Sequence, residues 1–188
     1  MSAAPATAAP TPRPTPSPVV LRGTGQTATD PLQLPAAISI VVFTHDGQRN
    51  FIVKSFRGSR EELLVNRIGA YEGRRPLTGT DPVRLNIEAD GNWTVTIVAI
   101  QCCSSSGEFS GKSDNVSNQF TPPGPLPSTW EFTHDGERNF IVRLHCRTSE
   151  QSVQNRIGTF SGSAILVMGG GPCYWQVQAD GNWAIKPR

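Results

Sequence analysis

The sequence predicts an all-β protein built from two tandem antiparallel β-sandwich domains that are related by internal duplication. The segment 43–53, FTHDGQRNFIV, returns 89 residues later as 132–142, FTHDGERNFIV. Apolar and polar residues alternate along short runs that end at Asp-Gly and similar turn residues, which is typical of half-buried strands. The 18 glycines and 16 prolines among 188 residues fit a turn-rich chain rather than a helical bundle.

The start of the chain predicts a disordered Pro/Thr-rich spacer. Residues 1–18 are almost entirely Ala, Pro, Thr and Ser, and every second residue from Pro10 to Pro18 is proline. Each proline favours extended geometry for itself and its predecessor, and the run has no apolar surface to bury. It lacks the basic start and the apolar stretch of a secretion signal. We therefore expect that an export signal has been removed ahead of Met1, with a cytoplasmic protein as the alternative.

Two further repeated segments set the domain organisation. The motif NRIG at 66–69 returns 89 residues later, and ADGNW at 89–93 returns 90 residues later. Two copies of this size are two small domains rather than a solenoid, which needs more and shorter repeats. The expected boundaries are a spacer at 1–18, the first copy at 19–100, a linker at 101–107 and the second copy at 108–188.

The first long strand of each copy follows from period-two alternation. In the run 39–44 we expect Val41 and Phe43 to face the core. Ile40 and Val42 then face solvent, because Glu131 stands at the place of Val42 in the second copy. His45-Asp46-Gly47 supplies the turn that follows.

The remaining elements follow in order. A strand is predicted at 50–56, and Asp90-Gly91 joins a strand at 83–88 to another at 93–100. The segment 61–65 is the one place where a short helix fits, although its counterpart at 150–154 is too polar to favour one. The predicted core is aromatic and consists of Phe43, Phe51 and Trp93 with Phe132, Phe140 and Trp183.

The cysteines predict a disulfide rather than a metal site. Cys146 and Cys173 stand where the first copy has Arg57 and Val83, so one copy carries both and the other neither. A bond between them closes a loop that stabilises a small domain by roughly 3 kcal/mol. It also favours an oxidising compartment outside the cytoplasm. The four cysteines have no zinc-type spacing, and Cys102-Cys103 could pair with each other, pair with another chain or stay reduced.

The repeated His-Asp pairs are the first candidates for chemistry. His45-Asp46 and its repeat His134-Asp135 end strands, where adjacent side chains point to different sides. Because no Ser or Cys nucleophile recurs in phase with them, we expect turn residues and no catalytic site. Each Asp-Gly turn offers one carboxylate where Ca²⁺ needs six or more oxygens, so we expect neither a metal nor another cofactor.

The candidate ligand contacts are four arginines and a tyrosine. Arg49 and Arg67 recur as Arg138 and Arg156, and paired guanidinium groups could bind anions or carboxylates, with solvated charges as the alternative. Tyr174 is the tyrosine that we expect to be most exposed, which suits a sugar-stacking contact. The other large aromatic residues are expected in the core.

Charge and hydropathy exclude two classes of partner. Seventeen Lys and Arg against 15 Asp and Glu give a net charge of +2, which offers no basic excess for nucleic acid. No stretch reaches the about 20 apolar residues that span a membrane. The partner expected is therefore a surface polymer or another protein.

Read as one pattern, each copy is F-T-H-D-G-x-R-N-F-I-V, then N-R-I-G-x-[YF]-x-G, then A-D-G-N-W. This pattern resembles small β-sandwich accessory domains of extracellular bacterial proteins, loosely of the pre-peptidase C-terminal type. The resemblance rests on turn and core residues and implies a non-catalytic extracellular or cell-surface module for adhesion, sensing or spacing. A carbohydrate- or wall-polymer-binding module is the alternative, and a hydrolase is the least favoured class.

Overall fold

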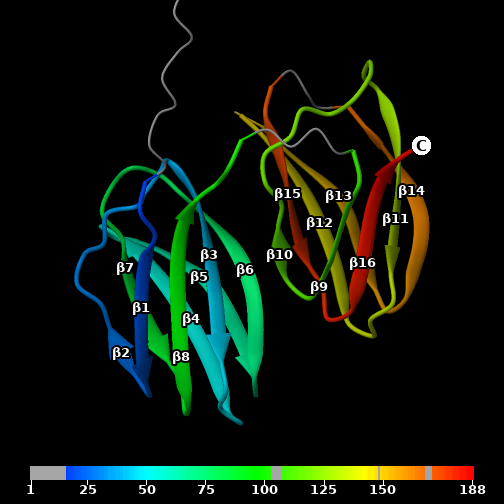
Figure 1. Cartoon of the computed structure of the whole chain (residues 1–188). Helices are drawn as coiled ribbons and strands as arrows, with labels where there is room; N and C mark the ends of the chain where they lie inside the picture. The colour runs from blue at the N-terminus through cyan, green and yellow to red at the C-terminus, as the bar shows by residue number, and fades with distance from the viewer. Residues whose placement is uncertain (1–15, 103–106, 148, 168–170) are drawn as a thin grey trace, which may run out of the picture.

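The chain folds into two all-β halves, each made of two packed four-stranded antiparallel sheets (Figure 1). The computed structural model describes residues 16–102, 107–147, 149–167 and 171–188. Most of the predicted spacer, 1–15, and most of the predicted linker, 103–106, lie outside the described residues. Residues 16–18 are exposed and have no regular structure.

The first half spans β1 to β8. Its strands are β1 (Val19–Thr24), β2 (Thr27–Ala28), β3 (Ile38–His45), β4 (Asn50–Arg57), β5 (Arg60–Ile68), β6 (Tyr71–Thr78), β7 (Arg84–Glu88) and β8 (Asn92–Ala99). One sheet has the order β1-β8-β3-β6 and the other β2-β7-β4-β5. The β3–β4 and β7–β8 connections both lead from one sheet to the other, and hydrogen bonds between Asp46 and Asn92 hold these two loops together at one end of the half.

The second half repeats this topology strand for strand. Its strands are β9 (Phe109–Lys112), β10 (Asn115–Val116), β11 (Ser128–His134), β12 (Asn139–Cys146), β13 (Ser149–Ile157), β14 (Phe160–Leu166), β15 (Cys173–Gln178) and β16 (Asn182–Pro187). The sheet orders β14-β11-β16-β9 and β10-β15-β12-β13 correspond to those of the first half. The predicted fold class is therefore confirmed.

Each half has its own hydrophobic core. The six aromatic residues predicted as core are all buried in these two clusters. The two cores differ in the size of two side chains, because Trp130 and Trp175 stand where the first half has Val41 and Leu85. The two Trp rings pack edge to face with their centroids 5.6 Å apart. Phe120 joins them there. The larger side chains therefore substitute at equivalent core positions rather than forming an exposed platform.

The segment 61–65, the one place where the sequence allowed a short helix, belongs to strand β5. The pairing of β4 with β5 shifts register between Val53 and Lys54, which marks a β-bulge. The bulge allows two successive residues, Leu64 and Val65, to be buried, and this doublet breaks the period-two pattern that would have identified a strand.

The predicted disulfide is confirmed. Cys146 and Cys173 face each other on the paired strands β12 and β15, with their Cα atoms 4.1 Å apart and a sulfur–sulfur bond between them. Cys102 is disulfide-bonded as well, and Cys103 lies outside the described residues. Oxidised cysteines agree with an oxidising environment.

The outer face of strand β3, which the sequence pattern predicts to be exposed to solvent, is covered by the second half. Ile40 points away from the core of the first half, yet it is only 4% exposed. Val116 and Tyr174 of the second half pack against it, with Val42 and Val98 alongside. The assignment of Ile40 to solvent was therefore wrong, because it considered one copy alone whereas the second half packs on this sheet.

Candidate functional site

The repeated His-Asp-Gly and Asp-Gly-Asn segments form one interlocked structure, which we call the latch (residues 45–49 with 90–92, and 134–138 with 180–182). In the first half, Asp46 accepts hydrogen bonds from the backbone N–H and the side-chain amide of Asn92, at 2.7 and 2.9 Å. Asp90 accepts in return from the backbone N–H groups of Gln48 and Arg49, both at 3.0 Å. Each carboxylate therefore fixes the opposite loop.

The second half contains the same latch. Asp135 accepts from the backbone and side chain of Asn182 at 2.6 and 2.7 Å. Asp180 accepts from the backbone N–H groups of Glu137 and Arg138 at 3.1 Å. In each half the latch joins two of the loops that lead from one sheet to the other, β3–β4 with β7–β8 and β11–β12 with β15–β16.

His45 faces Asp90 across the latch, not its sequence neighbour Asp46. Its Nδ1 donates to the carbonyl oxygen of Gly69 at 3.0 Å, and its ring stacks on Phe51 with centroids 4.5 Å apart. Its Nε2 lies 3.4 Å from Asp90 Oδ1 with the side chain fully buried. His134 makes the equivalent contacts with Gly158, Phe140 and Asp180. Both imidazoles thus brace the fold beneath the latch.

The glycine of the latch is required by close packing. A Cβ atom on Gly47 would lie 2.2 Å from Asp90 Oδ1 and 2.5 Å from His45 Nε2. Gly136 is crowded in the same way by Asp180 and His134. The repeated Asp-Gly dipeptides are therefore explained by the latch geometry.

The latch predicts a loss of stability in acid. Hydrogen bonds from Asn92 hold the pKa of Asp46 below its usual value of 3.8. Burial opposes the shift at Asp90, but the N–H groups of Gln48 and Arg49 still lower its pKa. A depressed folded-state pKa stabilises the fold above about pH 4, and this stability is lost as the pH falls through the folded value. Urea unfolding between pH 6 and 2 should show this decline, and Asp46→Asn should weaken it. An unchanged decline would contradict the assignment.

The junction between the halves is built around Asp114, in the turn between β9 and β10. The Asp114 side chain is 1% exposed. It accepts from Arg67 at 2.9 and 3.2 Å, from Arg75 at 2.9 Å and from the Tyr71 hydroxyl at 2.8 Å. The backbone N–H of Ala179 adds a fifth hydrogen bond at 3.0 Å. We call Asp114, Arg67, Tyr71 and Arg75 the clasp.

The clasp crosses from one half to the other. Asp114 belongs to the second half, whereas Arg67, Tyr71 and Arg75 belong to β5 and β6 of the first. The backbone N–H of Arg74 on the edge strand β6 also donates to the carbonyl oxygen of Asp114 at 2.9 Å. Burial raises the pKa of Tyr71, so its hydroxyl stays protonated and keeps donating to Asp114.

Tyr174 lies at the same junction, and the prediction that it is exposed was wrong. It is 5% exposed, packs with Ile40 and Val116, and stacks on His145 with centroids 4.8 Å apart. Burial raises its pKa to about 12. A stacking surface for sugars is therefore not what Tyr174 offers in this arrangement.

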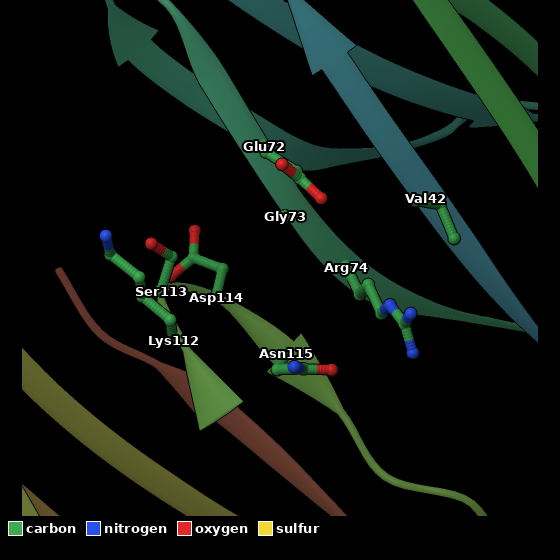
Figure 2. A pocket seen from close by; sticks show the side chains of 8 residues that line it. All are labelled: Val42, Glu72, Gly73, Arg74, Lys112, Ser113, Asp114 and Asn115. Carbon is green, nitrogen blue, oxygen red and sulfur yellow. The ribbon is translucent and has the colours of Figure 1, made fainter. Parts of the chain in front are cut away.

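A groove of about 360 Å³ opens beside the clasp. Figure 2 shows Glu72 and Arg74 on β6, with Lys112 at the end of β9 and Asn115 at the start of β10 nearby. Arg74 also lines two neighbouring hollows, so the groove continues along the junction. Its mixed charges could hold polar groups. Within the described ranges, no group of three or more His, Cys, Asp or Glu side chains is placed to hold a metal ion.

The four predicted arginines do not form one site. Arg49 and Arg138 are exposed at the latches, and Arg67 is committed to the clasp. Arg156 is exposed, with its guanidinium carbon 5.4 Å from the ring centre of Phe160.

Sequence reasoning missed Asp114 and Arg75. A signal was present, because the equivalent positions in the other copy are Gln26 and Ala164. In both cases a charged residue that one copy has and the other lacks lies at the contact between the copies.

Comparison of the chain with models of known protein families and with curated proteins found no match. Among the described residues, no helix has the length and apolar character needed to cross a membrane.

Proposed function

We propose that this chain is a non-catalytic extracellular or cell-surface accessory module that works in adhesion, sensing or spacing. The observation that carries the proposal is the clasp. A buried carboxylate of one half is held by five hydrogen bonds, four of them from side chains of the other half. Such a junction fixes two equivalent β halves in one orientation, which suits a module that presents surfaces at a set geometry.

The latch supports a non-catalytic role. General acid–base catalysis needs a titratable group that reaches substrate. The imidazoles of His45 and His134 are fully buried and stacked on Phe51 and Phe140. The most strongly repeated polar residues thus hold the fold together.

The disulfide supports a location outside the cytoplasm. The Cys146–Cys173 bond joins two buried side chains in the core of the second half. Cytoplasmic thiol systems keep most cysteines reduced, whereas exported proteins retain such bonds.

A second candidate is a carbohydrate- or wall-polymer-binding module. It is favoured by one observation, namely that several exposed residues are identical in the two halves although the fold does not use their side chains. Arg49 and Arg138 are the charged pair of this set.

The compartment can be tested on intact cells of the native host. Protease added outside should digest this protein without lysis, and Cys146 and Cys173 should react with maleimide only after reduction. Protection from protease until lysis, together with free thiols at both positions, would overturn the proposal. Sustained turnover of a substrate by the purified chain would overturn its non-catalytic part.

A further inference from the structure

The two halves have diverged over much of their outer surface. The exposed residues Gln48, Leu63 and Ala70 of the first half are replaced by Glu137, Ser152 and Thr159 in the second, which are also exposed. Most positions that stayed identical have a clear structural role, such as the buried Phe residues and the latch. An exposed residue that stayed identical without such a role therefore calls for another explanation.

Four exposed positions meet this description. Their side chains form what we call the end patch, one on each half: Arg49, Asn50, Asn66 and Ile68, and the equivalent Arg138, Asn139, Asn155 and Ile157. Thr44 and Thr133 are also exposed and identical, but threonine is favoured in strands generally.

Register places each end patch on one surface. Asn50 pairs with Ile68 across β4 and β5, and the next outward pair joins Ile52 with Asn66. The second half repeats both pairs between β12 and β13. The carbonyl oxygen of Arg49 accepts from Gly69 N–H at 2.7 Å, which sets Arg49 beside the end of β5.

The isoleucines are the least expected members of the patch. Ile68 and Ile157 are each 79% exposed. Single exposed apolar residues are normal on a protein surface. An exposed isoleucine that is kept at the same position in two diverged halves indicates a shared role. A side chain with this exposed fraction is not enclosed by a pocket, so it suits a long ligand lying across the protein surface rather than a small molecule in a cavity.

The polar members indicate the ligand chemistry. Within the described part of the chain, Arg49 and Arg138 have no carboxylate within ion-pair distance. A guanidinium group binds a carboxylate in a bidentate manner, and asparagine amides both donate to and accept from hydroxyl groups. Carboxylates and hydroxyls at regular spacing are the chemistry of an acidic polysaccharide.

The two end patches lie toward the same end of the molecule. In Figure 1 the β3–β4 and β11–β12 connections both lie at the lower end of their halves. Arg49 and Arg138 are the last residues of these connections, and the other patch residues follow on the adjoining strands. The clasp holds the halves in this relation, and the inference below is that one polymer chain contacts both patches. Linked sites bind a repeating ligand about 10²–10⁴-fold more tightly than either site alone.

We infer that the end patches together bind a polyuronate, a linear polymer of carboxylate-bearing sugars, with Arg49 and Arg138 contacting carboxylates of two separated units. The inference rests on the proposed extracellular role and names the ligand class. The binding is thereby assigned to the end patches and not to Arg67, whose guanidinium group already binds Asp114 in the clasp.

The test uses the full chain and polygalacturonate, with galacturonate monomer, neutral dextran and polyphosphate as comparison ligands. Calorimetry should show binding to polygalacturonate that is at least about 100-fold tighter than to the monomer. Arg49→Gln or Arg138→Gln alone should each remove most of that gain, and the double variant should abolish binding. Ile68→Ser with Ile157→Ser should weaken binding at least about tenfold, because an apolar contact with the sugar ring is lost from each site.

The matched control is Arg22→Gln with Arg60→Gln, which removes two exposed arginines away from the end patches and changes the net charge equally. It should bind like the unaltered chain. The inference is overturned if the control loses as much as the Arg49 and Arg138 double variant. It is also overturned if dextran or polyphosphate binds as tightly, or if polygalacturonate does not bind. Absence of binding would leave a spacing role standing, whereas new reducing ends in the polymer would overturn the non-catalytic proposal itself.

Discussion

Replacing Asp114 with alanine is expected to lower the free energy of unfolding by about 3–5 kcal/mol, because it leaves Arg67 and Arg75 without their shared counter-charge in a buried setting. The Tyr71 hydroxyl and the N–H of Ala179 lose their acceptor as well. The effect should be measured by urea unfolding and by calorimetry. We expect the calorimetric transition to split in two, because each half then unfolds separately and only one carries the Cys146–Cys173 disulfide.

Two variants make this prediction specific. Asp114→Asn keeps the shape of the side chain but removes its charge. It should therefore lower the free energy of unfolding measurably, but by less than Asp114→Ala. Asp81→Ala removes an exposed carboxylate of the first half and should change stability by no more than about 0.5 kcal/mol. A loss below about 1 kcal/mol for Asp114→Ala, with one unchanged transition, would show that the clasp does not hold the halves together.

The second large effect concerns the disulfide. Changing Cys146 and Cys173 together to alanine should lower the free energy of unfolding by roughly 3 kcal/mol, since the bond closes a loop of sequence separation 27. Both sulfurs lie in the core of the second half, so the change should act on that half. When Asp114→Ala has opened the clasp, only one of the two calorimetric transitions, that of the second half, should shift to lower temperature. Equal shifts of both transitions would contradict this assignment.

The fold was predictable because equivalent positions of the two copies can be compared within one sequence. Comparing Val41 with Trp130, and Phe43 with Phe132, distinguishes core positions from surface positions without any structure. The same comparison identified the Cys146–Cys173 pair. The strand at 61–65 was not recognised for a local reason, since the bulge opposite Val53 and Lys54 buries two adjacent residues and hides the strand period.

The candidate site was less predictable, because it depends on how the halves meet. Ile40 and Tyr174 are surface positions within their own half and become buried only at the junction. The repeat grouped Arg67 with Arg156. Of these two arginines, only Arg67 donates hydrogen bonds to Asp114. Period-two patterns describe one sheet at a time, so contacts between halves leave no periodic signal. The clasp left three signs in the sequence, because the clasp residues Asp114, Arg75 and Tyr71 have as counterparts Gln26, Ala164 and Phe160.

The clasp is proposed to fix the two halves in one orientation, with both latches at the same end of the molecule. Residual dipolar couplings of backbone amides in the full chain test this claim directly. We predict that the couplings of β1–β8 and of β9–β16 fit one alignment tensor with the relative orientation of this structure. Two tensors of different magnitude would mean that the halves reorient independently, and would contradict the account.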